Sequence, residues 1–110
     1  MKYTVSTEGR YTIITLDGDV DLHSSPQARK QVLHYLNNNH NIAVDLSGVG
    51  YIDSSGIATL VEGFQLSRKK RRQFALVGVS GMVTKVIQLA RLDAIFPIYN
   101  SVNDLLANNQ

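Results

Sequence analysis

A short apolar run that ends in a polar segment and leads straight into a helical pattern constrains the fold of this chain most. The run covers residues 42–46 (IAVDL), and the polar segment ends in Asp53, Ser54, Ser55 and Gly56, called here the DSSG segment. Apolar residues at 57, 60, 61 and 64 follow the spacing of one helix face. The sequence therefore predicts a strand, a loop and a helix with the DSSG segment at its N-terminus, where backbone N–H groups are exposed.

Two strand patterns and a helix pattern precede this unit. Residues 3–7 alternate along the chain, and residues 11–16 are rich in β-branched side chains. Glu8 and Gly9 lie between them and predict a hairpin. Ser24, Ser25 and Pro26 predict the start of a helix, with hydroxyl caps and a proline suited to the first turn. Its expected apolar face consists of Ala28, Val32, Tyr35 and Leu36.

Further strand and helix patterns follow the helix expected at 57–70. Residues 74–79 (FALVGV) are apolar without alternation, which is typical of a strand covered on both faces in a parallel sheet. Ser80 and Gly81 begin a helix, and residues 95–99 predict an edge strand because they contain Pro97. Residues 101–106 predict a last short helix. The expected apolar face of the helix after Ser80 consists of Val83, Val86, Ile87 and Ala90.

The order of these patterns predicts an α/β fold. We expect a mixed sheet of four or five strands, with an N-terminal hairpin, βα units and about four helices. Ligands and partners of such sheets meet the carboxyl ends of the parallel strands, and the loop at 46–56 lies there. With 110 residues and 44% apolar content, residues 1–110 are expected to form one domain.

The cysteine content and the lengths of the apolar runs indicate the compartment in which the protein works. The chain has no cysteine, which excludes disulfides and cysteine zinc sites and suits a reducing compartment. No apolar run approaches the roughly 18 residues of a membrane span. We therefore expect a soluble, cytoplasmic protein.

The net charge of +2 is unevenly distributed. Residues 68–72 (RKKRR) hold five of the eleven basic residues, and the rest of the chain has a balance of −3. This basic run could bind nucleic acid or an anionic membrane through phosphate contacts. The favoured interpretation is that it lies at the C-terminal end of a helix, where cations offset the helix dipole, because no aromatic residue is interleaved for base stacking. Five acidic residues lie near predicted strand ends, so one edge of the fold should be acidic: Asp17, Asp19, Asp21, Asp45 and Asp53.

Most chemical motifs can be rejected. Residues 17–28 lack the glycine and the glutamate of a calcium-binding EF-hand loop, residues 48–50 lack the third glycine of a dinucleotide loop, and no phosphate-binding P-loop is present. Neither serine of the DSSG segment lies in the Gly-x-Ser-x-Gly of a serine hydrolase, and only His23 is expected near it. No lysine follows the last strand, as a phosphoacceptor receiver domain would need. We expect no cofactor, no metal and no enzymatic activity.

Local physics leaves the role of the DSSG segment open. Asp and Ser are both good N-caps, and a cap is worth about 1 kcal/mol without any further function. No Glu or Gln stands three residues after any of these side chains, so a capping box is absent. A cap and a functional site are equally compatible with the spacing, and either Ser54 or Ser55 could be the functional serine.

The sequence nevertheless resembles the STAS domains, and within them the bacterial anti-sigma factor antagonists. Gly18-Asp19-Val20-Asp21 stands where that family has Gly-Glu-Leu-Asp, and Val44-Asp45-Leu46-Ser47 precedes the DSSG segment. The segment from Val77 to Leu92 is also similar. The resemblance extends over nearly the whole chain and implies a STAS fold.

The resemblance also implies a switch that is controlled by phosphorylation. Ser54, or less favourably Ser55, would accept the phosphoryl group, and Asp19, Asp21, Asp53, Ser55 and Gly56 would support the site or contact the partner. The unphosphorylated antagonist would bind an anti-sigma factor that is a serine kinase and release its sigma factor. A metal-dependent serine phosphatase would reset the switch. STAS domains are also accessory subunits of lipid-transport ABC ATPases, which is the alternative function.

Overall fold

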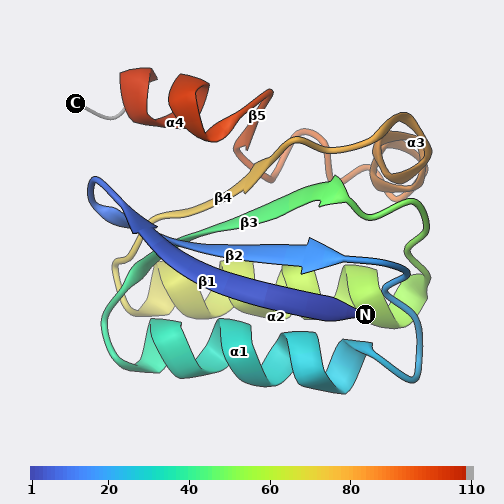
Figure 1. The fold of residues 1–110 in the computed structure, drawn as a ribbon, viewed down its shortest axis with the longest axis horizontal. Coiled ribbons are helices and arrows are strands. Elements are labelled where there is room, and N and C mark those ends of the chain that lie inside the picture. Colours follow the sequence, from blue (N-terminus) through green and yellow to red (C-terminus); the bar gives the residue numbers. More distant parts are fainter. Residues whose placement is uncertain (109–110) are drawn as a thin grey trace.

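The computed structural model describes residues 1–108, in which a five-stranded sheet carries helices on both faces (Figure 1). The strands lie in the order β1-β2-β3-β4-β5; β1 is antiparallel to β2, and the other neighbours are parallel. The predicted α/β fold, with its N-terminal hairpin, βα units and four helices, is confirmed. The elements are β1 (Lys2–Glu8), β2 (Tyr11–Asp17), α1 (Ser25–Asn37), β3 (Asn41–Gly48), α2 (Ser54–Lys69), β4 (Phe74–Val77), α3 (Gly81–Leu89), β5 (Ile98–Tyr99) and α4 (Val102–Asn108).

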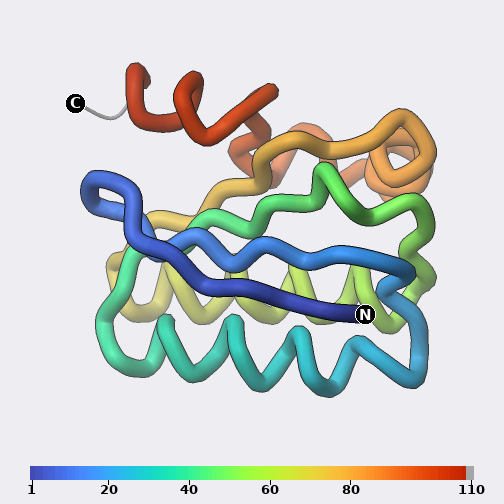
Figure 2. Tube along the Cα trace, in the orientation of Figure 1, coloured from blue at the N-terminus to red at the C-terminus, as the bar shows by residue number. Residues whose placement is uncertain are grey.

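The apolar strands β3 and β4 are covered on both faces, as their continuous hydrophobic patterns predict. Ile42, Val44 and Leu76 belong to the larger core cluster, which includes residues of α1, α2 and α3. Ala43 and Ala75 lie on the other face, in a smaller cluster with Leu105 of α4. In Figure 2, the paired α1 and α2 run below the sheet and α4 lies above it.

The buried stripe of α2 differs from the expected face at 57, 60, 61 and 64. Leu60 is buried, but Ile57, Val61 and Phe64 are only partly buried. Apart from Leu60, the buried positions of α2 are small or polar. An added Cβ at Gly63 would lie 2.7 Å from Val32 Cγ1 and 2.8 Å from Phe74 Cε2. Small side chains therefore let α2 approach α1 and the sheet closely, while larger ones flank the contact. The buried residues of α2 are Gly56, Thr59, Leu60, Gly63 and Ser67.

Three helices end in the same way, with a residue in the left-handed backbone region. These residues are Asn39 after α1, Arg71 after α2 and Arg91 after α3, with φ of 66°, 57° and 59°. In each case the next N–H bonds back to a carbonyl five residues earlier, as in Arg72 N to Ser67 O at 2.8 Å. This is the Schellman arrangement, in which backbone groups satisfy the last carbonyls of the helix and glycine is the usual residue at the left-handed position.

Two strands are shorter than the sequence patterns suggest. β4 ends at Val77, not at residue 79, because Gly78 turns the chain with a φ of 66°. β5 contains only Ile98 and Tyr99, because Ile95 N and Phe96 N bond to Leu92 O in a turn. The predicted edge position of this strand is confirmed.

Candidate functional site

Two loops join at the carboxyl ends of β2 and β3 and hold the DSSG segment in place. Val20 N donates to Tyr51 O at 3.0 Å, and Asp53 N donates to Val20 O at 3.1 Å. Val20 also forms an isolated parallel bridge with Ile52. These bonds extend the β2–β3 pairing beyond the sheet and bring Asp21 beside the start of α2.

Asp53 is the N-cap of α2. Its Oδ1 accepts the backbone N–H groups of Ser55 (2.9 Å) and Gly56 (3.2 Å) and the hydroxyl of Ser55 (2.6 Å). The hydroxyl bond of Ser55 is the main cause that lowers the pKa of Asp53, and backbone N–H groups, including that of Leu22, lower it further against the effect of desolvation. The capping role that the sequence left open among three residues therefore belongs to Asp53.

The two serines of the segment differ in their surroundings. Ser55 is partly buried and its hydroxyl is committed to Asp53. Ser54 is the first residue of α2 and is exposed, and its hydroxyl forms no hydrogen bond with any residue of the described range 1–108. Ser54 thus presents its hydroxyl at the surface, where it takes no part in capping or packing within the described residues.

Gly56 sets how tightly the segment rests on the loops beneath it. An added Cβ would lie 2.5 Å from Ile52 Cγ1 and 2.9 Å from Val20 Cγ1. Both neighbours belong to the paired loops, so no side chain fits between the first turn of α2 and its support. The glycine of the DSSG segment therefore has a packing role.

Asp21 organises the loop that leads into α1. Its Oδ1 accepts the backbone N–H groups of His23 (3.0 Å) and Ser24 (3.1 Å), and the bond from Ser24 N is the main cause that lowers the pKa of Asp21. The Ser24 hydroxyl donates to Asp19 O at 2.9 Å and does not cap α1, contrary to the sequence prediction. Asp19, Asp21 and His23 line a polar hollow of about 420 Å³ beside the segment.

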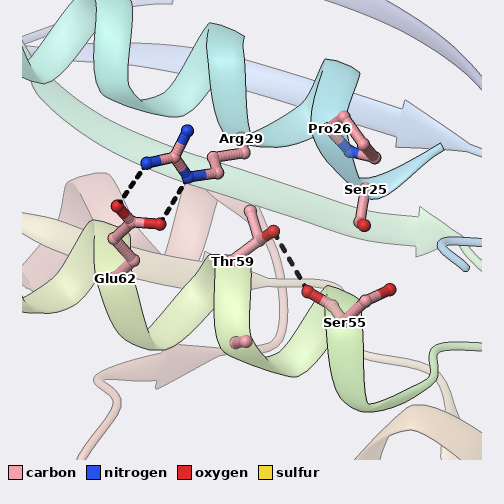
Figure 3. Close-up of a pocket in the computed structure, with 7 residues that line it drawn as sticks. Ser25, Pro26, Arg29, Ser55, Thr59 and Glu62 are labelled. Atoms are coloured by element: carbon pink, nitrogen blue, oxygen red, sulfur yellow. Dashed lines mark hydrogen bonds and ion pairs between the residues drawn. The ribbon is translucent and has the colours of Figure 1, made fainter. Parts of the chain in front are cut away.

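A second hollow, of about 460 Å³, opens between the first turns of α1 and α2 (Figure 3). Ser25 and Pro26 line it from α1, and Ser55 lines it from α2. Arg29 and Glu62 bridge the two helices along it, with Nε to Oε1 at 2.6 Å and Nη2 to Oε2 at 2.8 Å. This ion pair could not be predicted from the sequence, because residues 33 positions apart on two helices carry no local signal.

The charges separate along the molecule as the sequence suggests. The carboxyl ends of the strands and their loops carry the five acidic residues Asp17, Asp19, Asp21, Asp45 and Asp53, whereas the basic run at 68–72 lies at the C-terminal end of α2. These two ends are about 24 Å apart, from the length of the 16-residue helix. An acidic edge therefore surrounds the DSSG segment.

The described residues offer little support for catalysis at either serine. No histidine within residues 1–108 is hydrogen-bonded to Ser54 or Ser55, although a nucleophilic serine needs a base within such reach.

Two other kinds of feature are absent from residues 1–108. No group of three or more His, Cys, Asp or Glu side chains in that range could hold a metal ion. None of the helices described there has the length and apolar content needed to cross a membrane.

The fold and the sequence agree on the family. A model of the STAS domain matches residues 2–105. The chain therefore belongs to the STAS domain family, as the resemblance in the sequence predicted.

Individual relatives are known under related names. The chain is 29% identical over 96 residues to the anti-sigma F factor antagonist of Paenibacillus polymyxa, covering 84% of this chain and 82% of that protein. It is similar to the structure of an anti-sigma factor antagonist from Mycobacterium paratuberculosis, with a TM-score of 0.89 and 21% identity over 97% and 92% of the two chains. It is also similar to the phosphorylated Bacillus cell fate determinant SpoIIAA, with a TM-score of 0.78 and 17% identity over 99% and 100%. At these identities the two structures show a shared fold.

Proposed function

We propose that this protein is an anti-sigma factor antagonist, switched by phosphorylation of Ser54. The observation that carries the proposal is the exposed Ser54 hydroxyl, which lacks a hydrogen-bond partner among residues 1–108 and stands on a rigidly supported helix start. The name of the Paenibacillus relative and the existence of a phosphorylated structure with this fold support the same role. In its unphosphorylated form, the protein binds an anti-sigma factor and releases the sigma factor.

The partner in this proposal is itself a serine kinase. It transfers the γ-phosphoryl group of ATP to Ser54 Oγ, so that the bond to ADP breaks, a new phosphorus–oxygen bond forms and the hydroxyl proton passes to a base of the kinase. A metal-dependent serine phosphatase hydrolyses the phosphoserine and restores the binding form. The antagonist itself catalyses neither step and works in the cytoplasm with its partner.

Charge alone is sufficient to explain such a switch. A phosphoryl group adds about −1.5 to −2 charges at neutral pH. One like-charge contact near 4 Å is worth on the order of 4 kcal/mol at an effective dielectric of 20, whereas a hundredfold loss of affinity requires only about 2.7 kcal/mol. Phosphorylation can therefore block docking without any refolding of the domain.

The N-cap of α2 bears on how the free protein would accommodate the phosphate. A helix N-terminus usually holds an anion through its backbone N–H groups. Here the N–H groups of Ser55 and Gly56 already donate to Asp53. In this proposal these two N–H groups do not hold the phosphate on Ser54, which adds to the acidic edge and remains accessible to the phosphatase.

The test compares two single serine variants in the native host. We expect phosphopeptide mass spectrometry to find one phosphoryl group on the peptide that contains Ser54, to lose it in Ser54→Ala, and to retain it in Ser55→Ala. Ser55→Ala is the matched control because it removes a neighbouring hydroxyl that is committed to Asp53. Phosphate retained in Ser54→Ala at the wild-type level would rule out the assignment.

A second arm tests the partner. Unphosphorylated protein is expected to co-purify with a soluble ATP-dependent serine kinase, and Ser54→Asp to reduce that recovery. Co-purification with an ABC ATPase would instead support the alternative role as a transporter subunit. The exposed Ser54 favours the first outcome, since an accessory subunit does not require a free hydroxyl there.

A further inference from the structure

The cations at the end of the molecule opposite Ser54 form a surface that the proposed switch does not use. Asn41 links two turns there: its Nδ2 donates to Arg10 O at 3.4 Å, and its Oδ1 accepts from Gln73 N at 2.9 Å. The hairpin turn thus lies beside the turn between α2 and β4, at the same end of the sheet in Figure 1. We call the five cations on these two turns and at the end of α2 the basic pole: Arg10, Lys69, Lys70, Arg71 and Arg72.

These five side chains are not neutralised within the fold. The ion pair found among residues 1–108 joins Arg29 to Glu62, far from the basic pole. The neighbouring acidic residue Glu8 forms no ion pair with the pole. Arg68 is excluded from the pole because its guanidinium lies 5.8 Å above the ring of Phe64. The pole therefore presents a local excess of positive charge.

Offsetting the dipole of α2 does not account for this concentration of charge. Only Arg68 and Lys69 lie in the last turn of the helix, and Arg71 and Arg72 lie beyond it. Backbone N–H groups already satisfy the final carbonyls, including Lys70 N to Leu66 O at 2.9 Å. A helix dipole acts within its last turn, so most of the pole contributes little to helix stability.

We propose that the basic pole binds the surface of an anionic lipid membrane. Arg10, Lys70, Arg71 and Arg72 lie in turns and Lys69 ends α2, so no helix or strand carries a row of these cations into a nucleic-acid groove. No aromatic side chain is interleaved among residues 68–72 to stack on bases. A cluster of cations at one end of the molecule can face a planar array of anionic headgroups, to which each Lys or Arg near the surface adds about fivefold in affinity.

The distance between the two ends makes this association compatible with the switch. The DSSG segment and the basic pole are about 24 Å apart, along α2. This is about three times the Debye length of roughly 8 Å at physiological salt, so the acidic edge neither neutralises the pole nor is drawn to the membrane. A protein bound through the pole would hold Ser54 away from the lipid, free for its partner.

The test measures co-sedimentation of the full chain with vesicles of phosphatidylcholine, with and without phosphatidylglycerol, at about 0.15 M salt. We expect binding only to the vesicles that contain phosphatidylglycerol. Arg71→Gly should weaken this binding about fivefold, and the triple variant Lys69→Gln, Arg71→Gly, Arg72→Gln should weaken it on the order of a hundredfold.

Arg91→Gly is the matched control. Arg71 and Arg91 both occupy the left-handed position after a helix, so each glycine removes one charge and relieves the same backbone conformation. We expect Arg91→Gly to bind as the wild type does and neither variant to melt below it. Equal losses for both variants, or no binding to anionic vesicles, would overturn the proposal.

Competition with duplex DNA tests whether the basic pole prefers nucleic acid to the membrane. At equal phosphate concentration, we expect duplex DNA to leave vesicle binding nearly unchanged. Tighter binding to the duplex, with displacement from the vesicles, would assign the pole to nucleic acid and refute the membrane proposal. Ser54→Ala should bind vesicles normally, because this surface is independent of the phosphorylation site.

Discussion

Asp53 connects the start of α2 to the two loops beneath it. Its carboxylate receives the first N–H groups of the helix and the hydroxyl of Ser55, and its backbone N–H donates to Val20. The same carboxylate thereby leaves Ser54 as the serine without a local partner. The two serines differ because the hydroxyl of Ser55, and not that of Ser54, donates a hydrogen bond to Asp53.

The lowered pKa of Asp53 predicts a pH dependence of stability. A carboxyl whose pKa is lower in the folded state stabilises the fold above its ordinary pKa of 3.8, and this contribution is lost as the pH falls through the lower folded-state value. Asn can still accept the capping bonds but does not titrate. We expect Asp53→Asn to remain folded at neutral pH and to lose less stability than the wild type between about pH 4 and pH 2.

Urea unfolding at a series of pH values measures this difference. Asp21 also has a lowered pKa and remains in both proteins, so part of the acid sensitivity should persist. Identical curves for Asp53→Asn and the wild type would contradict the proposed role of the carboxylate.

At the scale of elements, α2 works as a close-packed helix whose small residues face inward. Gly56 and Gly63 let it approach the paired loops, α1 and β4. This packing fixes the position of the DSSG segment relative to Asp21, although the two come from different loops. The position of the site therefore depends on the packing of the whole of α2, in addition to the local hydrogen bonds.

Alanine should have opposite effects on stability at Gly56, in the first turn of α2, and at Gly81, the first residue of α3. Gly56→Ala places a Cβ 2.5 Å from Ile52 Cγ1, and overpacking of this kind costs about 1–3 kcal/mol. At Gly81, an added Cβ meets no atom within 4 Å, and replacing glycine there gains up to about 1 kcal/mol. We expect chemical denaturation to show a loss of about 1–2 kcal/mol for Gly56→Ala and a small gain for Gly81→Ala. If Gly56→Ala were more stable than the wild type, the paired loops would have to move aside for the Cβ at little cost.

At the scale of the whole molecule, the α/β topology separates charges that the net value of +2 conceals. Parallel strands collect the acidic loops at one end, and α2 carries the basic run to the other, along a molecule whose longest extent is 31 Å. The arrangement makes two surfaces that act independently when salt screens the space between them.

This separation predicts an effect that depends on ionic strength. At about 0.15 M salt, Ser54→Asp should change binding to anionic vesicles by less than about twofold, because the poles lie beyond the Debye length of roughly 8 Å. At about 0.01 M salt the Debye length is about 30 Å, and the added negative charge should then weaken binding measurably. Co-sedimentation of wild type and Ser54→Asp at both concentrations checks this. An equally large effect at both concentrations would indicate a direct contact between Ser54 and the membrane.

Residue patterns were sufficient to predict the order of the elements, the fold class and the placement of the DSSG segment at a helix start. These features depend on local spacing, caps and continuous apolar runs, which neighbouring residues encode. The packed structure gave the two serines different hydrogen-bonding surroundings, identified Asp53 as the cap and turned the small residues of α2 inward. It also brought Arg10 beside residues 69–72. Such relations depend on contacts between residues far apart in the chain, whose geometry exists only once the sheet and helices have packed.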